Sequence, residues 1–400
     1  GSGLRGAPIM RAIPSTGETV PAVGLSFSNH AVCGDPAALK EVLRTFVTNG
    51  GRVFDAMHGN AQAEQFHTTV AGELGAKEKL FWSVRGTAPA GAGGPPQLGP
   101  GSVKAQVDSL LARTGKPALD LVMLPPQGDP MHLAALKEEK KAGRVRYIGV
   151  QVIGDNVYPQ LETVMRNEPI DFIGVDYDIA NRARVEDTIL PLALERKIGV
   201  MAFFPFGNNG GVSCGGGSNL FGRVGDRPVP EWAADFDATT WAHFFLKYVI
   251  SHPAVTVARV GTTKAHHMLD NMGGGVGRLP DEATRKRMAE FIDSLPPVTV
   301  KLPPQSAHGP AGSLVLPTAV LDRYVGEYRT AGGSILNFRR YGNMLVVKAG
   351  PNDDRVIYGQ SETRFQFGPN AIEFQLDKSG KATGLIYEQD SRKIAASRVR

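Results

Sequence analysis

Residues 50–64, GGRVFDAMHGNAQAE, place a short apolar strand, Arg52–Ala56, just before a helix predicted over Ala61–Gly75. The same strand-then-helix unit recurs along residues 21–261, where eight apolar runs alternate with eight amphipathic segments. Most of the apolar runs are continuous in Val, Ile, Leu and Phe, which is typical of parallel strands covered on both faces. This alternation predicts an α/β fold, the (β/α)8 TIM barrel.

The composition divides the chain into four segments. Residues 1–10, GSGLRGAPIM, are interpreted as an expression scar and leader, and residues 11–295 as the barrel. Residues 296–318 are rich in Pro, Gly and Ser, which predicts a linker. Residues 319–400 change to short alternating strands separated by turn signals, so we expect a small antiparallel β domain there.

The overall composition narrows the class of protein. Hydrophobic residues make up 42% and charged residues 21% of the chain, as in ordinary globular domains. The net charge is +5, but Lys and Arg are scattered, so we expect no nucleic-acid partner. No apolar run approaches the ~18 residues of a membrane span. A small-molecule ligand is the expected partner, and the oligomeric state stays open.

Cysteine and histidine spacing gives no sign of a metal site. Cys33 and Cys214 make neither a disulfide framework nor a metal pattern. The adjacent His266 and His267 point about 100° apart on a helix, so they are not a metal-binding pair. We expect no metal. The Gly/Ala/Pro-rich start suits a protein exported to the periplasm after removal of its signal, with a cytoplasmic location as the alternative.

Several stretches, in order along the chain, resemble the aldo-keto reductases. They are RAIPSTGETVPAVGL from Arg11, GRVRYIGV from Gly143, LPLALERKIGVMAFFPFG from Leu190 and the last two units from Trp241. The resemblance covers nearly the whole barrel and is closest to a bacterial subgroup that is often exported. It implies hydride transfer from NADPH, with Asp, Tyr, Lys and His at the carboxyl ends of the strands. The stretch LDRYVGEY, from Leu321, resembles the β domain appended to bacterial β-lactamase-like serine hydrolases.

Only one residue of the family's catalytic tetrad is matched. In the family the tyrosine delivers a proton, the lysine pairs with the aspartate, and the histidine polarises the carbonyl. Here the aspartate matches Asp55, but Asn60 stands at the tyrosine position, Arg85 at the lysine position and Pro125 at the histidine position. Asparagine has no acidic proton, arginine does not deprotonate and proline has no donor. The sequence therefore predicts a degenerate tetrad.

The residues that hold the nicotinamide in the family have also changed. A Ser-Asn pair and a Gln normally bind its amide, and this chain has Gln151, Val152 and Gly174 there. The aromatic residue that stacks on the ring is kept in kind as Phe203. These changes weaken the expectation of hydride transfer.

The adenosine side of the family's cofactor site is changed in the same way. Gly261 and His267 replace the basic residues that bind the adenosine phosphate, whereas Asp270 and Asn271 are remnants of the adenine contact. We therefore expect no working cofactor, and NADPH dependence is the alternative.

A different catalytic set lies at the same end of the predicted barrel. His58 follows Asp55 by three residues, on the loop that leaves the strand, and histidine can act as acid or base near neutral pH. We predict Asp55, His58, Arg85 and Asn60 as catalytic candidates for non-redox proton transfer in a lyase, hydratase or isomerase. The alternatives are a surface position for His58 and a buried Asp55–Arg85 ion pair without catalysis.

Four further residues at these strand ends are predicted to bind substrate. They are Gln151, Asp176, Tyr177 and Phe203. Asp176 and Tyr177 are consecutive, so alternation along a strand allows only one to point inward, and Asp176 is favoured. Three functions stay open: a non-redox enzyme, a ligand-binding or scaffolding pseudo-reductase, and an NADPH-dependent oxidoreductase with an atypical site.

Overall fold

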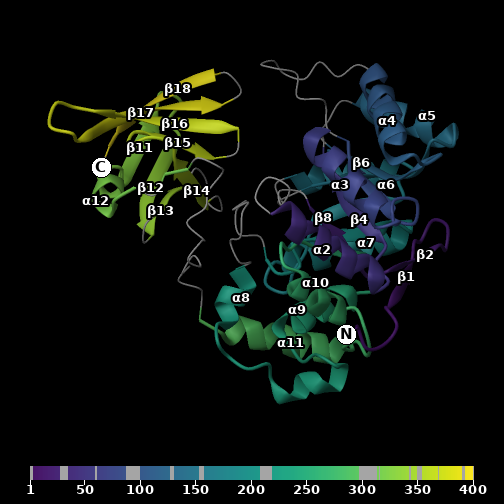
Figure 1. The fold of residues 1–400 in the computed structure, drawn as a ribbon. Helices are drawn as coiled ribbons and strands as arrows, with labels where there is room; N and C mark the ends of the chain where they lie inside the picture. The colour runs from purple at the N-terminus through teal and green to yellow at the C-terminus, as the bar shows by residue number, and fades with distance from the viewer. Residues whose placement is uncertain are drawn as a thin grey trace. The chain divides into compact units, whose positions relative to one another are not determined.

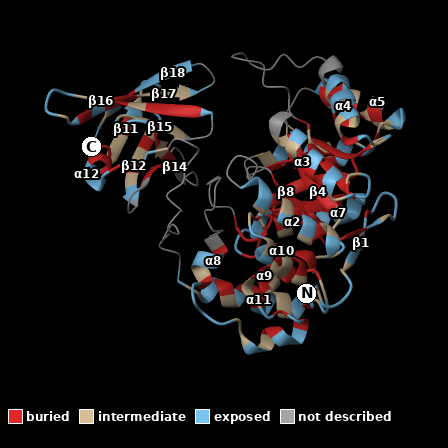
Figure 2. Ribbon diagram, viewed as in Figure 1, coloured by how far each residue is buried: buried red, intermediate tan, exposed pale blue. Residues whose placement is uncertain are grey.

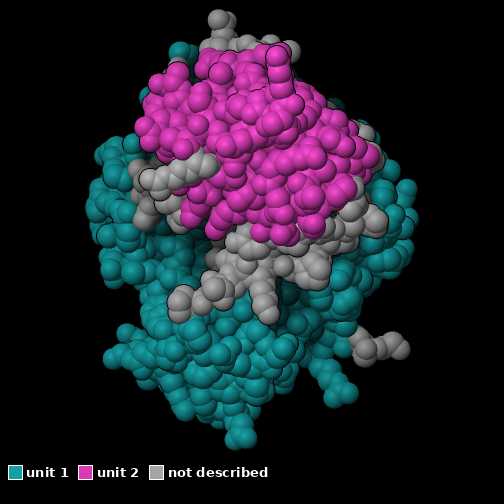
Figure 3. Space-filling view, turned by 90° about the vertical axis from the view of Figure 1, so that its left-hand side faces the viewer, with its two compact units in different colours: residues 1–90, 96–207, 218–298 teal, residues 91–95, 208–217, 299–400 magenta. Residues whose placement is uncertain are grey.

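The computed structural model of the chain describes two compact units (Figures 1 and 3). Described are residues 3–27, 35–58, 61–86, 100–126, 130–152, 157–207, 219–296, 313–314, 316–341, 344–348, 354–367, 369–389 and 392–399. The described residues up to 296 form the first unit, and those from 313 form the second.

The first unit is a closed barrel of eight parallel strands, which confirms the predicted (β/α)8 fold. The order around the barrel is β10-β3-β4-β5-β6-β7-β8-β9, with β10 pairing β3 to close it. The strands are β3 (Val23–Ser26), β4 (Val53–Met57), β5 (Phe81–Arg85), β6 (Leu119–Leu124), β7 (Val145–Gln151), β8 (Phe172–Asp176), β9 (Gly199–Phe203) and β10 (Val255–Val260).

Helices follow the strands and cover the barrel. They are α2 (Pro36–Thr48), α3 (Ala61–Glu73), α4 (Pro100–Thr114), α5 (Pro130–Lys141), α6 (Tyr158–Asn167), η2 (Val185–Ile189) running into α7 (Leu190–Arg196), α8 (Asn219–Val224), η3 (Glu231–Phe236), α9 (Trp241–Ile250), α10 (Ala265–Gly273) and α11 (Glu282–Ser294). The strands are almost wholly buried, while the helices are buried on one face and exposed on the other (Figure 2). None of the helices in the described part of the chain has the length and apolar character that crossing a bilayer requires.

Two apolar layers show which strand residues face the barrel interior. The inner cluster is made by Ile13, Val20, Val53, Phe81, Leu121, Met123, Tyr147, Phe172, Met201, Phe203 and Val257. Their chain neighbours, such as Phe54 and Trp82, belong to the larger cluster shared with the helices. Because side chains alternate along a strand, residues two or four positions beyond the inner layer also face inward. That rule brings Asp55, Gln151, Asp176 and Arg259 to the carboxyl ends of the interior.

Residues 8–10, which the sequence assigned to a scar and leader, are part of the barrel unit. Pro8 forms a bridge with Val276, and β1 (Met10–Ala12) pairs with β2 (Thr19–Pro21) as an antiparallel hairpin. The backbone of this stretch therefore finds partners for its polar groups in the barrel unit, and its interpretation as a scar and leader stays a prediction.

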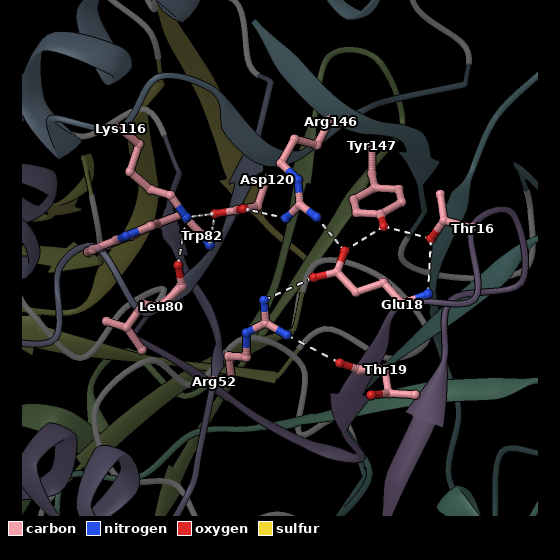
Figure 4. A network of polar contacts seen from close by, with 10 residues as sticks. All are labelled: Thr16, Glu18, Thr19, Arg52, Leu80, Trp82, Lys116, Asp120, Arg146 and Tyr147. Atoms are coloured by element: carbon pink, nitrogen blue, oxygen red, sulfur yellow. Dashed lines mark hydrogen bonds and ion pairs between the residues drawn. The ribbon is translucent and has the colours of Figure 1, made fainter. Parts of the chain in front are cut away.

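The amino ends of the strands are tied together by a polar network (Figure 4). Glu18, in the turn between β1 and β2, accepts hydrogen bonds from Arg52 at 2.9 Å and from the Tyr147 hydroxyl at 2.6 Å, and it pairs with Arg146. Arg146 also bonds Asp120 at 2.8 Å. Asp120, only 2% exposed, further accepts from the Trp82 backbone N–H and from Lys116. A fully bonded network at this face of a barrel indicates stability.

Replacing Asp120 by Ala should destabilise the barrel. The change leaves the Trp82 N–H, Arg146 and Lys116 without this acceptor, and a cost of about 2–3 kcal/mol is expected because the two cations are partly solvated. Urea unfolding followed by the helical circular dichroism signal measures it. Asp108→Ala, which removes an exposed ion pair to Arg144, is the matched control. A loss for Asp120→Ala no greater than for the control would contradict the structural role.

The second unit is an antiparallel β domain, as predicted, and it closes into an eight-stranded barrel. Each strand pairs with the next, and β18 returns to pair with β11. The strands are β11 (Gly326–Thr330), β12 (Ile335–Tyr341), β13 (Met344–Lys348), β14 (Asp354–Gly359), β15 (Arg364–Phe367), β16 (Asn370–Leu376), β17 (Ala382–Gln389) and β18 (Arg392–Arg398), preceded by α12 (Thr318–Asp322).

Aromatic rings fill the interior of this second barrel. Tyr324 stacks on Phe374 with ring centroids 4.1 Å apart, and Tyr328, Phe338 and Phe365 surround the same ring. Barrels of eight strands are narrow enough for side chains to fill.

The second unit begins earlier than the sequence predicted. Leu314 bridges to Gly359, and Leu316 belongs to the buried cluster of the second unit. The end of the predicted linker, residues 296–318, therefore lies against the β domain, because Leu316 is buried in its core and the backbone of Leu314 pairs with Gly359.

Candidate functional site

The carboxylate of Asp55, at the end of β4, is held between an arginine and a histidine. Asp55 is 2% exposed, and its Oδ2 accepts a hydrogen bond from Arg259 of β10. Nε2 of His58 lies 3.3 Å from Oδ1. Strand β3 separates β4 from β10, so closure of the barrel brings the two charges together.

These neighbours keep Asp55 ionised. Burial alone would raise the pKa of this carboxyl, but the charges and close contacts of His58 and Arg259 outweigh burial and hold the pKa well below its usual range. Asp55 is therefore an anion at neutral pH that orients the two groups around it.

Arg259 was missed by the sequence reading. Its guanidinium lies 3.9 Å from the centroid of the Phe203 ring and 5.7 Å from that of Phe204, in addition to its bond with Asp55. A signal was available, because an arginine two residues after an inward Val257 in an apolar parallel strand must be buried, and a buried charge needs a partner. Cation–π contact and ion pair together place Arg259 in the interior.

Arg85, at the end of β5, has no such partner. The structure contradicts the predicted Asp55–Arg85 ion pair, because Asp55 bonds Arg259 instead. The guanidinium of Arg85 makes no hydrogen bond or ion pair within the described residues, and its Nε is fully buried. Burial lowers the pKa of Arg85, the charge of Arg259 lowers it further, and Asp55 offsets part of that.

Two more buried polar atoms on β5 and just after β4 have no hydrogen-bond partner in the described chain. They are Oγ of Ser83, two residues before Arg85 on β5, and Nε2 of His58, which is near Asp55 but outside hydrogen-bonding geometry. Ser83 is the register partner of Asp55 in the β4–β5 pair. Buried polar atoms of native proteins are normally bonded, so such a group marks a place where a ligand or function is expected.

The predicted substrate-binding residues Gln151 and Phe203 lie in the same interior. Gln151 ends β7 and pairs in register with Gly174 of β8. A Cβ on Gly174 would lie 2.3 Å from the ring of Phe203, so the glycine makes room for that ring. Phe203 is fully buried with Arg259 against its face, and its predicted contact with a ligand stays a prediction.

The structure separates Asp176 from Tyr177. Asp176, at the end of β8, is 5% exposed and has the inward parity of Phe172. Tyr177 points to the outer layer, where its hydroxyl donates to Glu186 at 2.5 Å and accepts from Arg285 at 2.9 Å. Strand alternation thus directs Tyr177 to the helices, away from the inward Asp176, and its predicted contact with substrate stays a prediction.

The remaining candidates from the sequence are Asn60, Asp270 and Asn271. Asn60, like Cys33 and Cys214, is outside the described residues. Asp270 on α10 accepts a hydrogen bond from the Thr240 hydroxyl and lies 3.0 Å from Nε2 of His243, and Asn271 is 5% exposed. Burial raises the pKa of Asp270, but the hydrogen bonds and charges of His243, Thr240 and His267 together outweigh burial and lower it. The acidic remnant of the adenine contact is thus engaged within the protein.

Other features lie outside this set of residues. A cavity of about 240 Å³, lined among others by Arg11, Lys197 and Thr256, is at the amino ends of β9 and β10, opposite to Asp55. In the described ranges, no three His, Cys, Asp or Glu side chains are grouped so as to hold a metal ion.

These features define a class of protein: a (β/α)8 barrel with ionisable side chains at the carboxyl ends of its strands, where such barrels place their sites. The sequence matches the Aldo/keto reductase family over residues 26–286, and the chain belongs to that family.

Solved structures share the fold of the barrel. The holo form of aldo-keto reductase AKR11C1 from Bacillus halodurans is 18% identical, with 71% of this chain and 96% of that chain covered and a TM-score of 0.54. An aldo-keto reductase from Klebsiella pneumoniae in complex with NADPH is 18% identical, with 73% and 96% covered and a TM-score of 0.53. At these identities the similarity shows the fold alone. Among curated protein sequences, none matches this chain.

Removing Arg259 should destabilise the barrel strongly. Arg259→Leu leaves the buried Asp55 carboxylate with His58 alone, and breaking a buried ion pair costs about 3–5 kcal/mol. The double variant Asp55→Asn with Arg259→Leu should recover most of that loss, because no uncompensated charge is left. Urea unfolding of wild type, Asp55→Asn, Arg259→Leu and the double variant provides the double-mutant cycle. Additive losses in the double variant would show that the two residues do not interact.

The stability conferred by Asp55 should depend on pH in a defined direction. Its pKa is lower in the folded chain than the value of about 3.9 expected when unfolded, so its contribution is present above that value and is lost as the pH falls towards the folded pKa. The difference in unfolding free energy between wild type and Asp55→Asn should be smaller at about pH 3 than at about pH 5. Asp187→Asn, at an exposed position on η2, serves as the control. A difference that grows on acidification would refute the assignment.

Proposed function

We propose that this member of the aldo/keto reductase family carries out non-redox acid/base chemistry, of the lyase, hydratase or isomerase type, on a small polar or anionic molecule. The reaction takes place at the carboxyl ends of the barrel strands. The observation that carries the proposal is the set of Asp55, His58 and Arg259, in which an ionised buried carboxylate lies beside an imidazole.

His58 is the proposed proton acceptor and donor. Asp55 faces its Nε2 at 3.3 Å, which leaves Nδ1 to exchange a proton with the substrate. A carboxylate in this position orients the imidazole and stabilises the imidazolium that forms. Catalytic hydrogen bonds are often long before the substrate binds, so the imperfect alignment of Nε2 is compatible with this role.

Arg85 is proposed to stabilise negative charge on the substrate. When His58 takes a proton from a carbon next to a carbonyl or carboxylate, the electron pair moves onto oxygen, and a fixed cation there lowers the barrier. Transfer of that proton from His58 to a neighbouring atom of the substrate completes an isomerisation, and its transfer to a hydroxyl group that leaves as water completes an elimination. Asn60, on the same loop as His58, and Gln151 and Asp176 are proposed to contact the substrate.

The chain's residues fit NADPH poorly. The ring of Phe203, which matches the nicotinamide-stacking residue of the family, is covered by Arg259, and Arg259 is tied to Asp55. Gly174 stands where the family has its amide-binding Gln, and Phe203 fills the space beside it. These contacts support a function without this cofactor, and no metal is proposed.

Two alternatives each have an observation in their favour. Membership of the family and the remnants Asp270 and Asn271 favour an NADPH-dependent oxidoreductase with an atypical site. The bonded Asp55–Arg259 pair favours a non-catalytic ligand-binding or scaffolding protein. Export to the periplasm stays a prediction. The resemblance of the β domain to the one appended to β-lactamase-like serine hydrolases also stays a prediction.

NADPH should bind weakly or not at all. Calorimetric titration of the full chain with NADPH and with NADP⁺ is expected to give a dissociation constant weaker than about 1 mM. Arg259→Ala uncovers the face of Phe203 and should bind either nucleotide more tightly than wild type. Saturable binding to wild type well below 1 mM would favour the oxidoreductase.

Proton transfer can be tested without knowing the natural substrate. Small carbonyl and hydroxy acids are incubated with the protein in D2O, and exchange of carbon-bound protons is followed by NMR. For any compound that exchanges, His58→Ala and Asp55→Asn should slow exchange by about 10²–10⁴-fold, the usual contribution of a general base. Lys104→Ala, an exposed position on α4, is the control. Equal rates in both site variants would place the chemistry outside this pair.

A further inference from the structure

We propose that Arg85 is the binding residue for a carboxylate group of the ligand, with Arg259 and Ser83 beside it. This inference names the ligand class of the site and rests on the proposed function only for the location of that site. It starts from the state of the Arg85 guanidinium, which is partly buried, has a fully buried Nε and makes no hydrogen bond or ion pair among the described residues. Burying an unpaired charge is costly, so a protein keeps such a group where a ligand supplies the counter-charge.

Asp55 does not supply that counter-charge. Its two oxygens are directed to Arg259 and His58, so its charge is already compensated. The charges that act on Arg85 are Arg259, which disfavours a second cation, and Asp55, which offsets it in part. Asp176 is the other inward carboxylate at this end, but β8 lies opposite β4 in the barrel and three strands from β5. Arg85 is therefore left with excess positive charge around it.

Hydrogen-bond donors without acceptors gather at the same place. Nε of Arg85 and Oγ of Ser83 lie on one strand at inward positions two residues apart, and neither has a partner in the described chain. Ser83 lies in register with Asp55, next to His58. A group that offers only acceptor oxygens satisfies both donors, and a carboxylate is such a group.

The charge balance favours a carboxylate over a phosphate. Arg85 and Arg259 carry two positive charges, and Asp55 neutralises one of them. One negative charge from the ligand completes the balance of these three residues, whereas a phosphate dianion would exceed it. A planar guanidinium also matches the two oxygens of a carboxylate.

The proposal predicts that Arg85 lowers stability in the absence of ligand. Arg85→Gln removes an unpaired buried charge while keeping donors, so its thermal midpoint in chloride buffer should equal or exceed that of wild type. Arg44→Gln, which removes an exposed charge paired with Glu41, is the matched control. A clear loss of stability in Arg85→Gln alone would assign Arg85 a structural role and overturn the proposal.

Binding is measured on the full chain with glycolate, lactate and acetate, at constant ionic strength, by thermal shift and calorimetry. Wild type and Arg44→Gln should bind at least one of these carboxylates saturably, and Arg85→Gln should lose about 10–100-fold in affinity. Arg85→Lys should recover part of it, because one donor remains. Equal binding by wild type and Arg85→Gln, binding of inorganic phosphate without any carboxylate, or no binding at all would overturn the proposal.

The two proposals can fail separately. Carboxylate binding that depends on Arg85, with no proton exchange in any compound, supports this inference and removes the catalytic function. Proton exchange that depends on His58 but is unchanged in Arg85→Gln supports the catalytic function and overturns this inference.

Discussion

The ion pair between Asp55 and Arg259 is the interaction on which the carboxyl end of the barrel depends. A carboxylate this deeply buried needs a cation nearby, and Arg259 is that cation. Arg259 is on β10, which is separated from β4 by β3 and pairs with β3 to close the barrel. The same guanidinium lies on the Phe203 ring, and that ring occupies the space left by Gly174. One pairing therefore accounts for the position of the aromatic ring, for the small residue beside it and for an Arg85 without a partner.

The two ends of the barrel differ in how completely their buried polar groups are hydrogen-bonded. At the amino ends Glu18, Asp120 and Arg146 bond one another and their neighbours, which ties the first hairpin to three strands. At the carboxyl ends Ser83, Arg85 and His58 keep buried atoms without hydrogen bonds in the described chain. Buried polar atoms without hydrogen bonds are tolerated at one end of the barrel because the bonded network at the other end and the apolar layers between them stabilise the fold.

Much of the fold could be predicted from local pattern. The alternation of apolar runs with amphipathic segments, and the change to short strands after residue 319, predicted both domains, because strand and helix periods are properties of neighbouring residues. Closure of the second barrel by β11 and β18 was not predictable in this way, since it joins strands at the two ends of the domain. Nor was the pairing of Pro8 with Val276, which joins distant parts of the chain.

For the candidate site, the sequence by itself determined which ionisable residues end the strands: Asp55, Arg85 and Asp176 follow apolar runs, and alternation along a strand places them inward. Only the tertiary structure decided which of these charges meet. Asp55 and Arg259 are 204 residues apart in the sequence. Asp55 pairs with Arg259, and not with Arg85, which is closer in the sequence, because closure of the barrel brings β10 near β4. The partners of the Tyr177 hydroxyl, Glu186 and Arg285, likewise became known only from the tertiary structure. The strength of an ion pair depends on the distance between the two charges. Spacing in the sequence determines that distance only when both residues lie in the same helix or strand.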